Sequence, residues 1–146
     1  MKKSYLVLVL AATIAVGALT GMSAAEAKVL HYTAMLSGKN AVPPNDSKGS
    51  GEIKVRVNTK TMMLHWHGTY KGLTGPQTMA HFHGPAKAGT AAGVLVPAMA
   101  PSSPFKGKAK ITAAVAKDIA DGMVYYNVHT AAHPGGEISG WLKPAM

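Results

Sequence analysis

Cysteine is absent from the 146-residue chain, and acidic residues are few, with six Asp and Glu against fifteen Lys and Arg. Without thiols the chain can form neither a disulfide nor a thiolate metal site, so its stability must come from a packed core or from a bound metal. A metal ion would have to be held by histidine nitrogen, carboxylate oxygen or methionine sulfur.

Sequence motifs for common enzyme chemistry are also absent. The chain has no Gly-x-Ser-x-Gly nucleophile turn, no glycine-rich phosphate loop followed by Lys-Ser or Lys-Thr, and no pair of carboxylates at a usable spacing. These absences favour a binding protein over an enzyme.

The chain has a single long hydrophobic run, residues 5–19. It follows the basic Lys2-Lys3 and precedes Ala25-Glu26-Ala27, which is the pattern of a Sec-type signal peptide. The run is shorter than the roughly 20 residues that a membrane-spanning helix needs. We therefore expect residues 1–27 to be a signal peptide and residues 28–146 to be one periplasmic or secreted domain with no transmembrane segment.

The predicted mature chain is strongly basic. Without Lys2, Lys3 and Glu26, it has thirteen Lys and Arg against five Asp and Glu. Such an excess attracts polyanions, although the lysines are spread along the chain and form a local cluster only at residues 106–110. An exported protein meets no chromosome, so we expect anionic envelope polymers or lipids as polyanionic partners, and no nucleic acid.

Short segments of alternating polar and apolar residues, separated by turn residues, predict an all-β fold. The clearest alternation places Ile53, Val55 and Val57 on one face. A tight turn then leads into a second strand, so the two are predicted to form an antiparallel hairpin in which Trp66 faces the core. The predicted strands are 29–36, 50–57, 61–70, the segment around His81, 94–97, 123–130 and 137–142.

One segment, residues 112–121, has the pattern of a helix. Thr112 suits the N-cap, Val115 and Ile119 lie four residues apart on one face, and Gly122 is a natural stop. A single apolar stripe predicts that the helix covers one end of a β-sandwich. The preceding residues, 98–107, are predicted to form an irregular loop.

Histidines on predicted strands are the candidates for chemistry. Because side chains alternate along a strand, His81 and His83 project from one face, with Met79 beside them as a soft ligand for copper(I). His129 ends a later strand, and His133 follows four residues on. Neutral imidazole is a common ligand of zinc and copper. The pattern predicts a metal site of His81, His83 and His129, with His133 as the fourth ligand; a structural role in hydrogen-bonding loop backbones is the alternative.

A second His-x-His pair, His65 and His67, lies on the opposite strand face from Trp66. It would join the first pair only if the two strands were neighbours, and otherwise we expect it to be exposed to solvent. Glu137 is the one acidic residue beside the histidine-rich segments, and it is expected to accept an N–H from an imidazole or to pair with a cation.

Three stretches resemble landmarks of the chordin-type (CHRD) domain. Residues 80–86 (AHFHGPA) and 127–140 (NVHTAAHPGGEISG) resemble the paired signature of that family, and residues 40–44 (NAVPP) resemble a third landmark. They occur in the expected order, and the resemblance spans about residues 29–142, which is essentially the whole predicted mature chain. The resemblance implies an extracytoplasmic, immunoglobulin-like antiparallel Greek-key β-sandwich, here with one short helix, and it implies no settled activity.

The order of His-x-His and a later Val-His is also similar to the copper site of Cu/Zn superoxide dismutases. The chain lacks the disulfide cysteines and the His-and-Asp zinc loop of that family, and its single arginine, Arg56, is on a distant strand. Three hypotheses follow. The chain is an exported copper- or zinc-binding module for metal buffering or delivery, an envelope interaction module with structural histidines, or a copper oxidoreductase similar to the dismutases.

Overall fold

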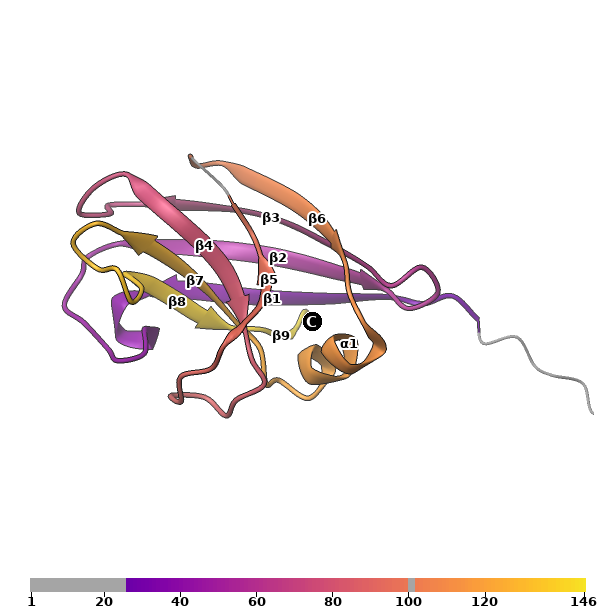
Figure 1. Ribbon diagram of the computed structural model, residues 1–146. Coiled ribbons are helices and arrows are strands. Elements are labelled where there is room, and N and C mark those ends of the chain that lie inside the picture. Colours follow the sequence, from indigo (N-terminus) through magenta and orange to yellow (C-terminus); the bar gives the residue numbers. More distant parts are fainter. Residues whose placement is uncertain (1–25, 100–101) are drawn as a thin grey trace, which may run out of the picture.

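A computed structural model describes residues 26–99 and 102–146. This part of the chain is built almost entirely from strands (Figure 1). The elements are β1 (Val29–Ser37), a 3-10 turn (Gly38–Asn40), β2 (Ser50–Asn58), β3 (Met63–Lys71), β4 (Gln77–His83), β5 (Val94–Pro97), β6 (Phe105–Lys110), α1 (Ala113–Ala120), β7 (Tyr125–Thr130), β8 (Ile138–Trp141) and β9 (Lys143–Pro144).

The strands form one antiparallel sheet in the order β5-β4-β7-β8-β1-β2-β3-β6, and β9 adds to β1. The junction between β8 and β1 is narrow, since only Ser37 and Ser139 pair across it. The sheet can therefore fold over at this junction, so that β5-β4-β7-β8 faces β1-β2-β3-β6 (Figure 1). The all-β fold with one short α-helix is confirmed, whereas the Greek-key path and the immunoglobulin likeness stay predictions.

The core fills the space between the two halves of the sheet. Trp66 of β3 meets Phe82 of β4 edge to face, with ring centroids 5.2 Å apart. Phe105 of β6 stacks on Tyr126 of β7 at 5.5 Å. Such aromatic contacts bury large apolar areas and fix how the halves lie on each other.

The hairpin predicted around Trp66 is confirmed. Strands β2 and β3 pair antiparallel along their whole length, with Val55 opposite Trp66. Trp66 is 5 % exposed, so the alternation identified the buried face correctly.

The predicted helix is also confirmed as α1. The Thr112 hydroxyl accepts a hydrogen bond from the backbone N–H of Val115 at 3.2 Å, and Ile119 is buried. Gly122 ends the helix with a φ of 71°, a conformation that glycine adopts without a steric penalty.

Two strands contradict the expectations from sequence. Residues 98–107 were expected to be irregular throughout, but β6 begins at Phe105 and continues to Lys110. Its inward positions include Gly107, which leaves room for the indole of Trp66: an added Cβ would lie 2.2 Å from that ring. Strand β6 therefore lacks a clear alternation of polar and apolar residues, and its packing depends on Trp66 of β3. Strand β9 is the second addition, and it contains only two residues.

The predicted signal peptide is almost entirely outside the described residues. Among the residues that the structure does describe, no helix is long and apolar enough to cross a membrane.

Candidate metal centre

The candidate centre lies on the outer face of β4 and β7, which are neighbours in the sheet. Ala80 and Val128 are opposite each other and face the core. Because side chains alternate along a strand, the residues on either side of Ala80 and of Val128 point outward. In the pairing of β4 with β7, His129 lies opposite Met79, and His83 lies opposite Tyr125. The pairing of two strands 48 residues apart in sequence thus brings three imidazoles to one surface.

His81, His83 and His129 are close enough to share one ion. Within the described residues, one ligand atom from each lies within 4.8 Å of the others. Nδ1 of His81 is 3.2 Å from Nε2 of His129. Two nitrogens on a tetrahedral zinc ion, each about 2.0–2.1 Å from the metal, would be about 3.3 Å apart. The observed separation therefore suits two ligands of the same ion.

Two loops fix the orientation of His83 and His129. Nδ1 of His83 donates to the carbonyl oxygen of Ala92 at 3.0 Å, and Nδ1 of His129 donates to that of Pro134 at 2.8 Å. A carbonyl can only accept, so each neutral ring carries its proton on Nδ1 and has its lone pair on Nε2. Nε2 of His129 is within hydrogen-bond distance of Nδ1 of His81, at 3.2 Å, and can accept its proton when no metal is bound. Hydrogen bonds of this kind orient the histidine ligands of many metal sites.

Nε2 of His83 is buried and has no hydrogen-bond partner among the described residues. His83 and His129 are only 9 % and 5 % exposed to solvent, whereas His81 is half-buried. Buried polar atoms in folded proteins are nearly always paired with protein or with ordered water, so this nitrogen is available to a metal ion or to a water molecule.

The surroundings of His81 and His83 lower the pKa of both rings and so favour their neutral forms. Burial lowers the pKa of His81, and the nearby rings of His129 and His83 lower it further because a second positive charge would be repelled. Burial also lowers the pKa of His83, which the hydrogen bond to Ala92 only partly offsets. The neutral form is the one that coordinates a metal.

Aromatic packing supports one side of the group. Tyr125 stacks on His83 with centroids 5.0 Å apart and planes 8° apart, and its hydroxyl accepts from the N–H of Ala92. Trp141 packs on the other side of Tyr125 at 4.6 Å. We did not identify Tyr125 from sequence, although side chains alternate along a strand and Tyr125, four residues before His129, is on the same face of β7.

Glu137 has a different role from the one expected. It is fully buried, and its carboxylate accepts hydrogen bonds from the Ser47 hydroxyl, the N–H and hydroxyl of Thr74, and the Thr130 hydroxyl. No imidazole is among these donors, so the expected contact with a histidine ring is wrong. The carboxylate instead joins two loops to the end of β7, next to His129.

The other candidate residues are not members of the three-histidine group, although Met79 lies directly opposite His129 in the pairing of β4 with β7. His133 is in the turn after β7, where its backbone bonds to Thr130 and Gly136, and its side chain is not a member of the group. Met79 is exposed on β4. His65 and His67 are on β3, which is not a neighbour of β4, so four imidazoles do not converge.

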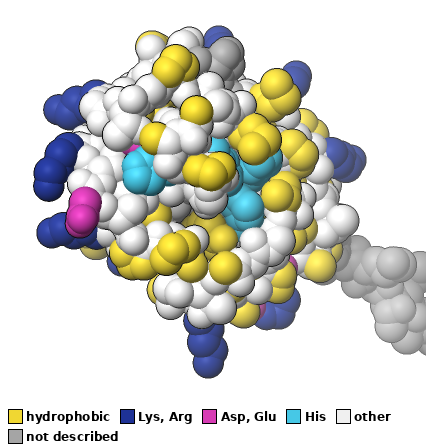
Figure 2. Space-filling model, turned by 60° about the vertical axis from the view of Figure 1, so that its left-hand side comes forward, with side chains coloured by type: hydrophobic (Ala, Val, Ile, Leu, Met, Phe, Trp, Pro, Cys, Tyr) yellow, Lys and Arg dark blue, Asp and Glu magenta, His cyan; other side chains and the backbone are white. Residues whose placement is uncertain are grey.

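Figure 2 shows histidine side chains gathered on one face of the molecule, bordered by hydrophobic side chains. A family model for the CHRD domain matches residues 32–142. The chain belongs to the CHRD domain family. The matched region of this CHRD protein runs from within β1 to just beyond β8 and contains the three histidines and both loops that hold them. Comparisons with curated proteins and with solved structures give no match.

Proposed function

We propose that this CHRD protein is exported and binds a copper or zinc ion through His81, His83 and His129, for metal buffering or delivery. The observation that carries the proposal is the grouping of His81, His83 and His129, with one ligand atom from each within 4.8 Å of the others, together with the buried Nε2 of His83, which has no partner among the described residues. Histidines with a purely structural role would be expected to pair their buried nitrogens.

The arrangement suits a metal that can be exchanged. Three protein nitrogens leave one position of a tetrahedral ion open for water or for a ligand of a receiving molecule. The half-buried ring of His81 gives a route from solvent to that position. A buffering or delivery protein needs such access.

Titration of copper(II) and of zinc into the metal-free protein tests the site. We expect His81→Ala, His83→Ala and His129→Ala each to weaken binding by more than about tenfold, since a lost ligand should matter at least as much as a lost supporting residue. His31→Ala is the matched control, because His31 is exposed on β1 in the other half of the sheet. His133→Ala tests the predicted fourth ligand and should have a smaller effect.

The metal-binding proposal fails if the parent binds neither metal more tightly than about micromolar, or if the three variants bind as the parent does. Circular dichroism of each variant confirms that a weaker affinity does not come from unfolding.

Export is the second part of the proposal. The backbone N–H of Lys28 donates to the Thr59 hydroxyl, and its carbonyl accepts from the N–H of Thr59, so the ordered sheet begins next to the expected cleavage after Ala27. Intact mass of protein from the extracytoplasmic fraction should correspond to a chain starting at Lys28. Retention of residues 1–27 would contradict it.

A further inference from the structure

The second His-x-His pair and the lysine cluster have no part in the proposed metal site, but they lie together elsewhere. Both are on the outer face of β1-β2-β3-β6, where the strand register aligns them in two rows. One row contains His31, Arg56, His65 and Lys108, and the other contains Thr33, Lys54, His67 and Lys106.

This face is hollowed along the two rows. A groove of about 940 Å³ is lined by all eight side chains of the rows and by Glu52. A second hollow of about 470 Å³ adjoins it and shares Glu52, Lys54, His67 and Lys106. Together they form an extended depression, which we call the basic groove.

The positive charges in the basic groove are fixed at regular intervals. Residues two apart on one strand are about 6.6–6.8 Å apart, and β2 and β6, with β3 between them, are about 9.6 Å apart. Lys54, Arg56, Lys106 and Lys108 are all exposed. The regular spacing suits a polymer with repeated negative charges better than a single small anion.

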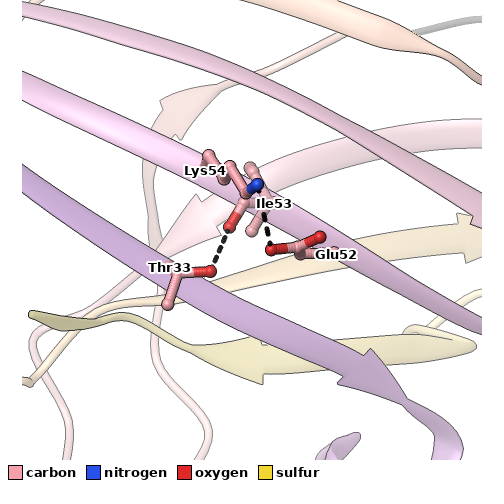
Figure 3. Close-up of polar contacts among 4 residues, drawn as sticks. All are labelled: Thr33, Glu52, Ile53 and Lys54. Atoms are coloured by element: carbon pink, nitrogen blue, oxygen red, sulfur yellow. Dashed lines mark hydrogen bonds and ion pairs between the residues drawn. The ribbon is translucent and has the colours of Figure 1, made fainter. Parts of the chain in front are cut away.

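Hydroxyl-binding groups lie among these charges. Glu52 forms an ion pair with Lys54 at 3.6 Å, and the Thr33 hydroxyl donates to the carbonyl of Ile53 at 3.2 Å, which leaves its oxygen able to accept (Figure 3). A carboxylate in a basic groove repels an anion, but it accepts hydrogen bonds from the hydroxyl groups of a sugar.

We propose that the basic groove binds a linear acidic polysaccharide. The lysines and the arginine pair with its carboxylate, sulfate or phosphate groups, while Glu52 and Thr33 bind its hydroxyl groups. Single-stranded nucleic acid fits less well, because its bases stack on exposed aromatic side chains, whereas the aromatic residues that line the basic groove, Tyr32, Trp66 and Phe105, are each only 5 % exposed. A bilayer surface is flat and does not enter a hollow.

Binding of heparin and of alginate at about 0.15 M salt, in the presence of EDTA, tests the groove. The groove variant carries Lys54→Gln, Arg56→Gln, Lys106→Gln and Lys108→Gln. The control carries Lys39→Gln, Lys48→Gln, Lys60→Gln and Lys87→Gln, four exposed residues that do not line the groove and give the same net charge. We expect the groove variant to bind at least one polymer about tenfold more weakly and with a shallower salt dependence, and the control to bind within about twofold of the parent.

Several results would overturn the proposal. The proposal fails if the parent binds neither polymer, if the control loses as much affinity as the groove variant, or if phosphatidylglycerol vesicles or oligo(dT) bind the parent more tightly than both polysaccharides do. Thermal unfolding checks that the groove variant is folded. If the groove variant is unfolded, a double variant with Lys54→Gln and Arg56→Gln, both on β2, is used in its place. Because the groove and the three histidines lie on different halves of the sheet, His83→Ala should leave polysaccharide binding unchanged.

Discussion

Gly135 and Gly136 are neighbours in the turn after β7, but they meet different surroundings. Gly136 has a φ of 127°, and a Cβ added to it would lie 2.2 Å from Oδ1 of Asn127, whereas nothing lies within 4 Å of one added to Gly135. Gly136→Ala should lower the free energy of unfolding by about 2 kcal/mol or more through backbone strain and displacement of Asn127. Gly135→Ala is the matched control and should change it by less than about 0.5 kcal/mol.

Urea unfolding measures both glycine variants. Equal effects would show that Asn127 is not packed against this turn. Since the same turn supplies the Pro134 carbonyl that orients His129, Gly136→Ala should also weaken metal binding.

Trp66 offers a second test at the level of single residues. It is almost fully buried between the two halves of the sheet, so Trp66→Ala should cost about 3–5 kcal/mol of stability. Its indole N–H is buried and has no hydrogen-bond partner in residues 26–99 and 102–146. Trp66→Phe should therefore cost clearly less, because it retains an aromatic ring and removes an unpaired donor. A loss below about 1 kcal/mol for Trp66→Ala, measured by urea unfolding, would contradict the burial of this side chain.

At the scale of elements, Glu137 connects the β1–β2 loop, the β3–β4 loop and the end of β7. Burial raises the pKa of its carboxyl, but hydrogen bonds from Ser47, Thr130 and Thr74 outweigh this and hold the pKa below its usual value. A pKa that is lower in the folded than in the unfolded chain stabilises the fold above the unfolded value, about 4.3, and that contribution is lost as pH falls through the folded value.

The parent should therefore lose stability in acid more steeply than Glu137→Gln, which has no carboxyl at this position to titrate. At neutral pH the variant should be less stable by about 1.5–3 kcal/mol, because hydrogen bonds to a charged acceptor are lost. Unfolding by urea at a series of pH values measures both effects. Parallel curves would show that this carboxylate does not set the acid stability.

Strand alternation was sufficient to predict β2, β3 and the buried face of Trp66, because one face of each strand is apolar and the other is polar. It failed for β6, where alternate lysines face outward but the inward positions include Gly107, which has no side chain and so leaves space for the ring of Trp66. That fit depends on which strands are neighbours. For the same reason, the sequence could not show whether His65 and His67 lie near β4, because this depends on the order of the strands in the sheet.

The sequence predicted some parts of the candidate site and not others. Period two along β4 placed His81 and His83 together, and the family resemblance pointed to His129. The carbonyls of Ala92 and Pro134, which set the ring orientations, come from loop conformations that carry no side-chain pattern. Glu137 was noticed for its position, but its partners are hydroxyl and backbone groups of segments distant in sequence.

At the scale of the whole molecule, a bound metal should stabilise the fold by mass action. At a free metal concentration of about 100 times Kd, the gain is about 2.7 kcal/mol. For a domain of this size that corresponds to a rise of roughly 10 °C in Tm. Thermal unfolding with and without zinc should show this rise in the parent and in His31→Ala, but not in His83→Ala. An equal rise in His83→Ala would place the metal elsewhere.

Strand β1, near the start of the described chain, pairs with both β8 and β9 near its end. A chain made from its amino end therefore cannot complete the sheet until its last residues are available, and pairings between distant segments form slowly. Until then β1 lacks one neighbour, and only core packing, such as that of Trp66 on Phe82, joins the half-sheet containing β4 and β7 to the rest. The protein should stay unfolded during synthesis, which is the state in which a polypeptide can be threaded through a narrow translocation channel.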